Sequence, residues 1–200
     1  STISDANNRV PYQVYENLFY AMLKKCNTIT QSTKFKFKNP LYALDSSIID
    51  LCLAVFDWAK FRRAKGGIKL HSLVDLKTQI PTFNVITTAK ESDVKVAKRE
   101  AFPLTPDSII TFDRAYVDFE LFQSYQNAKV FFVTRAKDNL RFELLGQQKI
   151  PKKKGLQFDQ IVQIKNPKQR QKYPGKLRLI GYFDHDKNKT YLFLTNNFKL

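Results

Sequence analysis

The stretch Ser108-Ile109-Ile110-Thr111-Phe112-Asp113-Arg114-Ala115-Tyr116 decides the fold of this chain. Its apolar run ends on Asp113 and a helical pattern follows directly, so we predict a buried strand that leads into a helix. Open α/β sheets build their sites at the carboxyl ends of such strands. Asp113 therefore stands where a functional carboxylate is expected.

The apolar pattern on either side of this stretch predicts a mixed sheet flanked by helices. We expect a first strand that begins at 41–45, further strands at 68–75, 80–88, 108–112 and 129–134, and helices at 10–25, 92–101 and 118–127. An antiparallel start that feeds into parallel strand–helix–strand units is typical of the ribonuclease-H-like α/β fold. Three segments are expected: an N-terminal helix and connector at 1–40, a ribonuclease-H-like core at 41–137 and a basic β-rich insertion at 138–200.

The charge of the chain favours a polyanionic partner. Lys and Arg number 34 against 18 Asp and Glu, which gives a net charge of +16 and a pI near 9.8. Within Lys149–Arg178 there is one acidic residue, Asp159, among many basic ones. Such a basic excess is typical of nucleic-acid binding, and the alternative is a solvated surface that maintains solubility. In this region we predict DNA contacts at Lys152, Lys153 and Lys154.

Several classes of protein have no support in the sequence. The two cysteines, Cys26 and Cys52, form no metal-ligand cluster and no disulfide framework, which favours a reducing compartment. There is no P-loop, no glycine-rich dinucleotide motif and no Ser/His/Asp order. No signal peptide or bilayer-length apolar run is visible, so we expect a cytoplasmic protein without a membrane partner. Because the chain begins at Ser1 and its one methionine is Met22, we also expect a fragment or a processed product.

A second aspartate, Asp45, follows the apolar start of the first predicted strand. Two carboxylates that converge from different strands can hold Mg²⁺, and a two-metal site clamps the attacking and leaving oxygens of a phosphoryl displacement. The alternative is that Asp45 caps a turn through Ser46-Ser47 and Asp113 caps the following helix. The other aspartates that compete as ligands are Asp50, Asp57 and Asp75.

Further basic residues lie beside the predicted strands. Arg62, Arg63 and Lys65 precede a glycine pair, in a loop that either grips phosphates or forms a solvated turn. His71, with Lys69 nearby, either contacts DNA or a metal or has a structural role, since no second histidine lies at ligand spacing. The candidate phosphate contacts closest to Asp113 are Arg114 and Arg135.

Several segments together resemble bacterial insertion-sequence transposases, specifically the DDE transposases with a Tyr-Arg-Glu-Lys signature. The similar segments are Leu44-Asp45-Ser46-Ser47-Ile48-Ile49-Asp50, Phe56-Asp57-Trp58-Ala59-Lys60-Phe61-Arg62, Lys65-Gly66-Gly67-Ile68-Lys69-Leu70-His71, Thr111-Phe112-Asp113-Arg114-Ala115-Tyr116, Phe132-Val133-Thr134-Arg135-Ala136-Lys137 and Tyr191-Leu192-Phe193-Leu194-Thr195-Asn196-Asn197-Phe198. The resemblance covers nearly the whole chain.

This resemblance implies a ribonuclease-H-like catalytic core in which Asp45 and Asp113 are the first two members of the DDE triad. It implies two Mg²⁺ or Mn²⁺ ions that activate water or a DNA 3′-hydroxyl for attack on a phosphodiester. The expected partner is double-stranded DNA, which includes the element's ends and the target. A homodimer in a synaptic complex is one option for the assembly. The expected location is the bacterial nucleoid.

The sequence departs from the family pattern at one point. The family's third carboxylate lies in a helix of the form Tyr-x-x-Arg-x-x-x-Glu, and none of the glutamates here matches it. We therefore expect this chain alone to be inactive. Two alternatives remain: a non-catalytic basic nucleic-acid-binding module, in which neither aspartate matters, and a stand-alone ribonuclease-H-like nuclease or resolvase, which needs another acidic residue near the pair.

Overall fold

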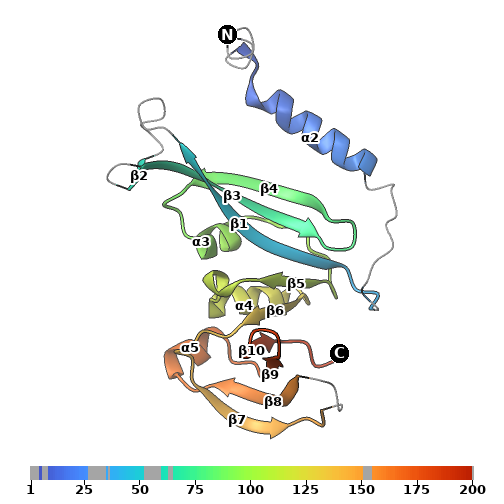
Figure 1. Ribbon diagram of the computed structural model, residues 1–200, viewed down its shortest axis with the longest axis vertical. Coiled ribbons are helices and arrows are strands. Elements are labelled where there is room, and N and C mark those ends of the chain that lie inside the picture. Colours follow the sequence, from blue (N-terminus) through green and yellow to red (C-terminus); the bar gives the residue numbers. More distant parts are fainter. Residues whose placement is uncertain are drawn as a thin grey trace.

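The computed structural model of the chain describes residues 5, 9–26, 35, 37–51, 60–62, 65–150 and 155–199, with the backbone alone at 60–62 and 65. Its described strands form one ten-stranded sheet in the order β2-β3-β1-β5-β6-β10-β9-β8-β7, with β4 paired to β3. Figure 1 shows the N-terminal helix α2 at one end of the long axis and strands β7 to β10 at the other.

One half of this sheet has the ribonuclease-H-like arrangement. Strands β1 (Leu41–Leu51), β3 (Lys65–Asp75) and β4 (Ile80–Thr88) are antiparallel neighbours. Strands β5 (Ile109–Phe112) and β6 (Phe131–Arg135) then add in parallel on the other side of β1. The resulting order, β4-β3-β1-β5-β6, is three antiparallel strands followed by two parallel ones, and the predicted fold class is confirmed.

Helices α3 (Asp93–Arg99) and α4 (Phe119–Asn127) lie beside this half of the sheet (Figure 1), and the 3₁₀ turn η2 (Arg114–Tyr116) contacts α3. Ser92 and Asp118 cap α3 and α4 by accepting backbone N–H bonds, as their residue types favour. The core forms where α4 meets β5 and β6: the Phe122 ring stacks on Phe132 at 4.2 Å and lies 6.2 Å from Phe112. Because strand side chains alternate, residues out of phase with these point to the opposite face.

The second half of the sheet is the predicted β-rich segment. It contains β7 (Phe142–Gln147), β8 (Leu156–Ile164), β9 (Leu177–Asp184) and β10 (Lys189–Thr195), all antiparallel. Strand β10 pairs with β6, so this half continues the core sheet without a break.

Helix α5 (Pro167–Lys172) was not predicted from the sequence. Its cap is Asn166, and Pro167 stands in its first turn, a combination that favours a helix start. The helix has six residues, which is too short for an apolar period to mark it in the sequence.

Strand β1 begins as predicted and runs on to Leu51, so Asp45 lies inside it. One further element differs from the sequence predictions. In the expected basic loop, Arg62 lies in β2 (Lys60–Arg62) and faces Lys65, which with Gly66 and Gly67 belongs to β3. Residues 63 and 64 lie outside the described residues. Helix α2 (Tyr12–Cys26) is close to its predicted range, has no buried residue and contacts β4.

Candidate active site

Asp45, Asp113 and Arg135 lie in one row across three adjacent parallel strands. The last paired residues of β1, β5 and β6 are Leu44, Phe112 and Thr134, and the row follows each by one position. Neighbouring strands are about 4.8 Å apart, so the two aspartate backbones are direct neighbours. The sheet thus brings together the two carboxylates and one arginine that the sequence identified separately.

Asp45 projects from the middle of β1 with an exposed side chain. Its neighbour Leu44 is 1% exposed and belongs to the helix-covered core, so strand alternation directs Asp45 to the other face. The backbone N–H of Ser46 donates to Asp45 Oδ1 at 2.8 Å. The alternative that Asp45 caps a turn through Ser46-Ser47 is not met, because these residues continue the strand.

Asp113 follows β5 with extended backbone angles, φ −77° and ψ 177°. Its Oδ1 accepts the Ala115 N–H at 2.8 Å and caps η2, so the capping role predicted as the alternative is present. Its side chain remains exposed. Capping occupies one carboxylate oxygen and leaves room for a second role at the other.

These two carboxylates have the chemistry that a hard divalent cation requires. Among the described residues, hydrogen bonds reach only Oδ1 of each aspartate, and none reaches either Oδ2. Carboxylate oxygens at 2.0–2.6 Å are the usual ligands of Mg²⁺ and similar ions. The pair therefore fits such an ion, although the described residues contain no group of three His, Cys, Asp or Glu side chains able to hold one.

Arg135, in the row, and Arg114, next to Asp113 in the chain, are held by different contacts. Arg135 lies over the Tyr191 ring of β10, with its guanidinium carbon 4.6 Å from the ring centroid. Arg114 donates to Asp138 at 3.1 Å in an exposed ion pair, which contributes little to stability. Both stay predicted phosphate contacts.

Lys69 and His71 do not lie where DNA contacts are expected, and this prediction is corrected. The residues are 8% and 0% exposed, and they point toward α3. Lys69 donates to Asp93 Oδ1 at 3.1 Å, and His71 Nδ1 lies 3.7 Å from the same oxygen. Burial lowers the pKa of His71 more than the Asp93 carboxylate raises it, so the imidazole is neutral at pH 7. The structural role that the sequence left open for His71 applies.

The structure does not describe the side chains of the remaining predicted site residues. Arg63, Lys152, Lys153 and Lys154 lie outside the described residues, as does the competing ligand Asp57. For Arg62 and Lys65 the backbone alone is described. DNA contacts at these residues stay predictions.

The other two competing aspartates are set apart from the row. Asp50 lies in β1, five positions beyond Asp45, and faces Gly67 of β3. Asp75 accepts the N–H groups of Lys77 and Thr78 and caps the turn between β3 and β4. Neither extends the pair formed by Asp45 and Asp113.

The sequence reasoning missed Asp93, the first residue of α3. Its Oδ1 accepts the Ser46 hydroxyl at 2.9 Å as well as the Lys69 ammonium. Tyr116, beside this contact, is 1% exposed, and burial together with the charges of Asp93, Asp45 and Asp113 raises its pKa. The Tyr116 hydroxyl makes no hydrogen bond with a described residue. The nearby Ser46 hydroxyl opposes part of the rise in the Tyr116 pKa.

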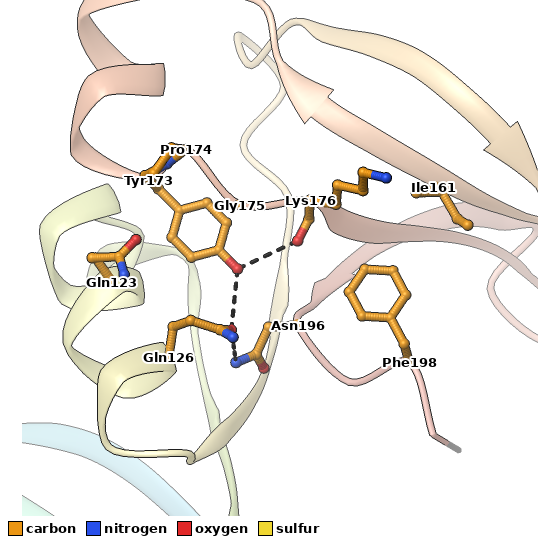
Figure 2. Close-up of a pocket in the computed structure, with 9 residues that line it drawn as sticks. All are labelled: Gln123, Gln126, Ile161, Tyr173, Pro174, Gly175, Lys176, Asn196 and Phe198. Carbon is orange, nitrogen blue, oxygen red and sulfur yellow. Dashed lines mark hydrogen bonds between the residues drawn. The ribbon is translucent and has the colours of Figure 1, made fainter.

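A pocket of about 560 Å³ lies on a different part of the molecule, between α4, the Tyr173–Lys176 segment and the end of β10 (Figure 2). The Asn196 amide donates to Gln126 Oε1 at 2.9 Å and to the Val130 carbonyl at 3.0 Å, while its Oδ1 accepts the Phe132 N–H. These contacts tie the end of β10 to the core. Neither aspartate of the row lines the pocket, so it is separate from the candidate site.

No helix among the described residues is long and apolar enough to cross a membrane.

Two curated transposases are similar to this chain. It is 28% identical over 140 residues to the "Probable transposase for insertion sequence element IS5377" of Geobacillus stearothermophilus, covering 70% of this chain and 36% of that protein. It is 27% identical over 159 residues to the "Putative transposase y4zB" of Sinorhizobium fredii, covering 80% and 43%. The chain thus spans less than half the length of these relatives.

Among solved structures, a piggyBac transposase synaptic complex with hairpin DNA is similar with a TM-score of 0.48 and 12% identity, over 82% of this chain and 34% of that one. The sequence profile described as the transposase DDE domain matches residues 36–200. Since that match covers far more than half of the length of this chain, the chain belongs to the transposase DDE domain family.

Proposed function

We propose that this chain is a catalytic segment of an insertion-sequence DNA transposase, in which Asp45 and Asp113 hold Mg²⁺ or Mn²⁺ ions for phosphodiester cleavage and strand transfer. The observation that carries the proposal is their adjacency at the ends of the Leu44–Phe112 pairing, with an oxygen of each carboxylate unbonded to described residues. Membership of the transposase DDE domain family supports it.

In this function the protein side chains orient ions and DNA. Asp45 and Asp113 supply anionic oxygens from a rigid sheet. When bound, a pair of divalent ions lowers the pKa of an attacking water or hydroxyl and stabilises charge on the phosphate oxygens. Arg135, one strand further along the row, contacts a DNA phosphate, with Arg114 beside it. The basic excess of the chain attracts the duplex in a salt-dependent way.

The whole activity belongs, in this proposal, to a longer protein. The curated relatives are more than twice as long as the region they share with this chain. We propose that a segment of the Tyr-x-x-Arg-x-x-x-Glu type supplies the third carboxylate and the Tyr-Arg-Glu-Lys signature. This longer protein acts on element ends and target DNA, as a homodimer in a synaptic complex, on the bacterial nucleoid. The present chain is expected to bind DNA without cleaving it.

Mn²⁺ binding tests this proposal on the chain itself. Electron paramagnetic resonance measures free and bound Mn²⁺ in the wild-type chain and in Asp45→Asn and Asp113→Asn. Loss of one carboxylate from a two-carboxylate site should weaken Mn²⁺ binding at least tenfold, while DNA affinity at fixed salt should stay within about twofold.

Asp50→Asn is the matched control, because Asp50 is an exposed aspartate of the same strand. It should leave Mn²⁺ binding unchanged. A loss with Asp50→Asn but not with Asp45→Asn would move the site along β1 and overturn the assignment. DNA binding with no Mn²⁺ site at all would support the non-catalytic binding module instead.

A further inference from the structure

A buried polar cluster lies on the helix-covered face of the sheet, directly beneath the strand that carries Asp45. Its centre is Asp93 Oδ1, which accepts the Ser46 hydroxyl at 2.9 Å and the Lys69 ammonium at 3.1 Å. Lys69 also donates to the Glu91 carbonyl at 2.9 Å. Three elements, β1, β3 and the start of α3, are therefore joined at one carboxylate oxygen.

This cluster is costly to place inside the fold. The side chains of Lys69 and Asp93 are 10% and 17% exposed, and the neighbouring His71 side chain is 0% exposed. Desolvation of a buried ion pair offsets most of its Coulomb attraction, and apolar residues of similar size are often at least as stabilising. Stability alone thus gives a weak reason for the cluster, and its contact with Ser46 offers a second one.

Ser46 connects the cluster to the candidate site. Its hydroxyl is held by Asp93 on one face of β1, and its backbone N–H donates to Asp45 Oδ1 at 2.8 Å. Successive side chains of a strand point to opposite faces, so fixing the Ser46 side chain on the inner face fixes the peptide from which Asp45 projects on the outer face. The orientation of the Asp45 carboxylate is therefore coupled to Asp93 through one residue.

We propose that Asp93 is a positioning residue for Asp45, acting through Ser46 and held in place by Lys69. The inference rests on the proposed function, because it assigns the cluster to the metal-holding carboxylate. Outer contacts of this kind set the orientation of a metal ligand, and their loss typically weakens metal affinity tenfold or more.

The first measurement is independent of metal and of activity. Three-bond couplings from NMR give the χ1 rotamer of Asp45 in the wild-type chain, Ser46→Ala, Ser46→Thr and Asp93→Ala. We expect one dominant rotamer in the wild type and averaged couplings in Ser46→Ala and Asp93→Ala. Ser46→Thr keeps the hydroxyl and suits a strand, so it should restore the single rotamer.

Two controls separate positioning from general destabilisation. Ser124→Ala removes a serine hydroxyl bond of similar length within α4, and Asp118→Asn alters another helix-start carboxylate with a lysine partner. Neither residue is hydrogen-bonded to Ser46, and neither variant should change the Asp45 couplings. If Asp93→Ala does not fold, Ser46→Ala, which removes a single hydroxyl, carries the test.

The second measurement is Mn²⁺ affinity by electron paramagnetic resonance. We expect it to fall about tenfold in Ser46→Ala and to recover in Ser46→Thr. A single Asp45 rotamer in both Ser46→Ala and Asp93→Ala, with wild-type Mn²⁺ binding intact, would overturn the positioning role and spare the proposed function. In another outcome, Ser46→Ala and Asp93→Ala give averaged couplings, but the wild-type chain binds no Mn²⁺ through Asp45. That result would show that Asp93 orients Asp45 through Ser46, and it would overturn the assignment of Asp45 as a metal ligand.

Discussion

Two buried ion pairs, one in each half of the sheet, are built in different ways. In the second half, Arg178 binds Asp159 through both carboxylate oxygens, at 2.6–2.9 Å, and donates a further bond to the Asn197 carbonyl. In the core, Lys69 and Asp93 meet through a single oxygen, which also accepts Ser46. The first pair is a closed fork between neighbouring strands, and the second links the interior to a residue beside the candidate site.

The geometry of the two ion pairs distinguishes a structural pair from one linked to the site. Bidentate Arg–carboxylate geometry satisfies both partners locally and fixes the alignment of β8 with β9 and the segment after β10. A shared oxygen transmits the position of one group to another. We therefore expect loss of the Arg178 pair to affect stability alone, and loss of the Lys69 pair to affect the site as well.

The largest effect is expected for Asp159→Ala. This change leaves the mostly buried Arg178 guanidinium without its carboxylate, and breaking a buried pair in this way costs about 3–5 kcal/mol. Urea unfolding followed by circular dichroism measures the loss. Mn²⁺ affinity below the unfolding transition should equal that of the wild type, and a weakened Mn²⁺ site would contradict the purely structural role.

A smaller loss of stability is expected for Lys69→Met. Methionine keeps much of the side-chain volume, and the Asp93 carboxylate retains the Ser46 hydroxyl, so we expect a cost of about 1–3 kcal/mol. Unlike Asp159→Ala, this variant should also weaken Mn²⁺ binding, because Asp93 loses the group that holds it. Equal Mn²⁺ affinity in Lys69→Met and the wild type would remove the contrast between the two pairs.

The smallest effect concerns Glu120, an exposed carboxylate that bridges the two halves by contacting Lys172 of α5 at 2.8 Å and Lys98 of α3 at 2.6 Å. These two lysines, Lys172 first, lower the pKa of Glu120 from 4.5 to about 2. A lowered folded-state pKa gives stability that is present above pH 4.5 and is lost as the pH falls toward 2. Carboxyl ¹³C shifts in an acid titration measure this pKa, and Lys172→Met should raise it. An ordinary midpoint in the wild type would contradict the bridge.

Much of the architecture was predictable from local patterns. Strand β4 has the predicted bounds, and the apolar run before Asp113 forms β5. Asp45 and Asp113 could be selected because their residue type and position after an apolar run carry a chemical meaning. Their placement in one row required the pairing of β1 with β5, which joins residues 68 positions apart and leaves no local signal.

The error at β3 shows where local patterns fail. Alternation along β3 places Ile68 and Leu70 on one face and Lys69 and His71 on the other, and the polar pair occupies the buried face. Which face is buried depends on α3, whose first residue, Asp93, supplies the partner for the lysine. A charged residue was thus read as exposed because its partner lies 24 positions away.

The pairing of β6 with β10 determines where such chains tolerate changes in length. Arg135 faces Phe193, and its guanidinium rests on Tyr191, two residues earlier in β10. A strand shifted by one residue turns all its side chains to the other face, so a deletion in the tight connection between β9 and β10 would remove Tyr191 from Arg135. The connection between β7 and β8 lies two strands farther out, and its length is free to vary without moving this arginine. Variation among related chains should therefore accumulate in the outer hairpin and spare the inner one.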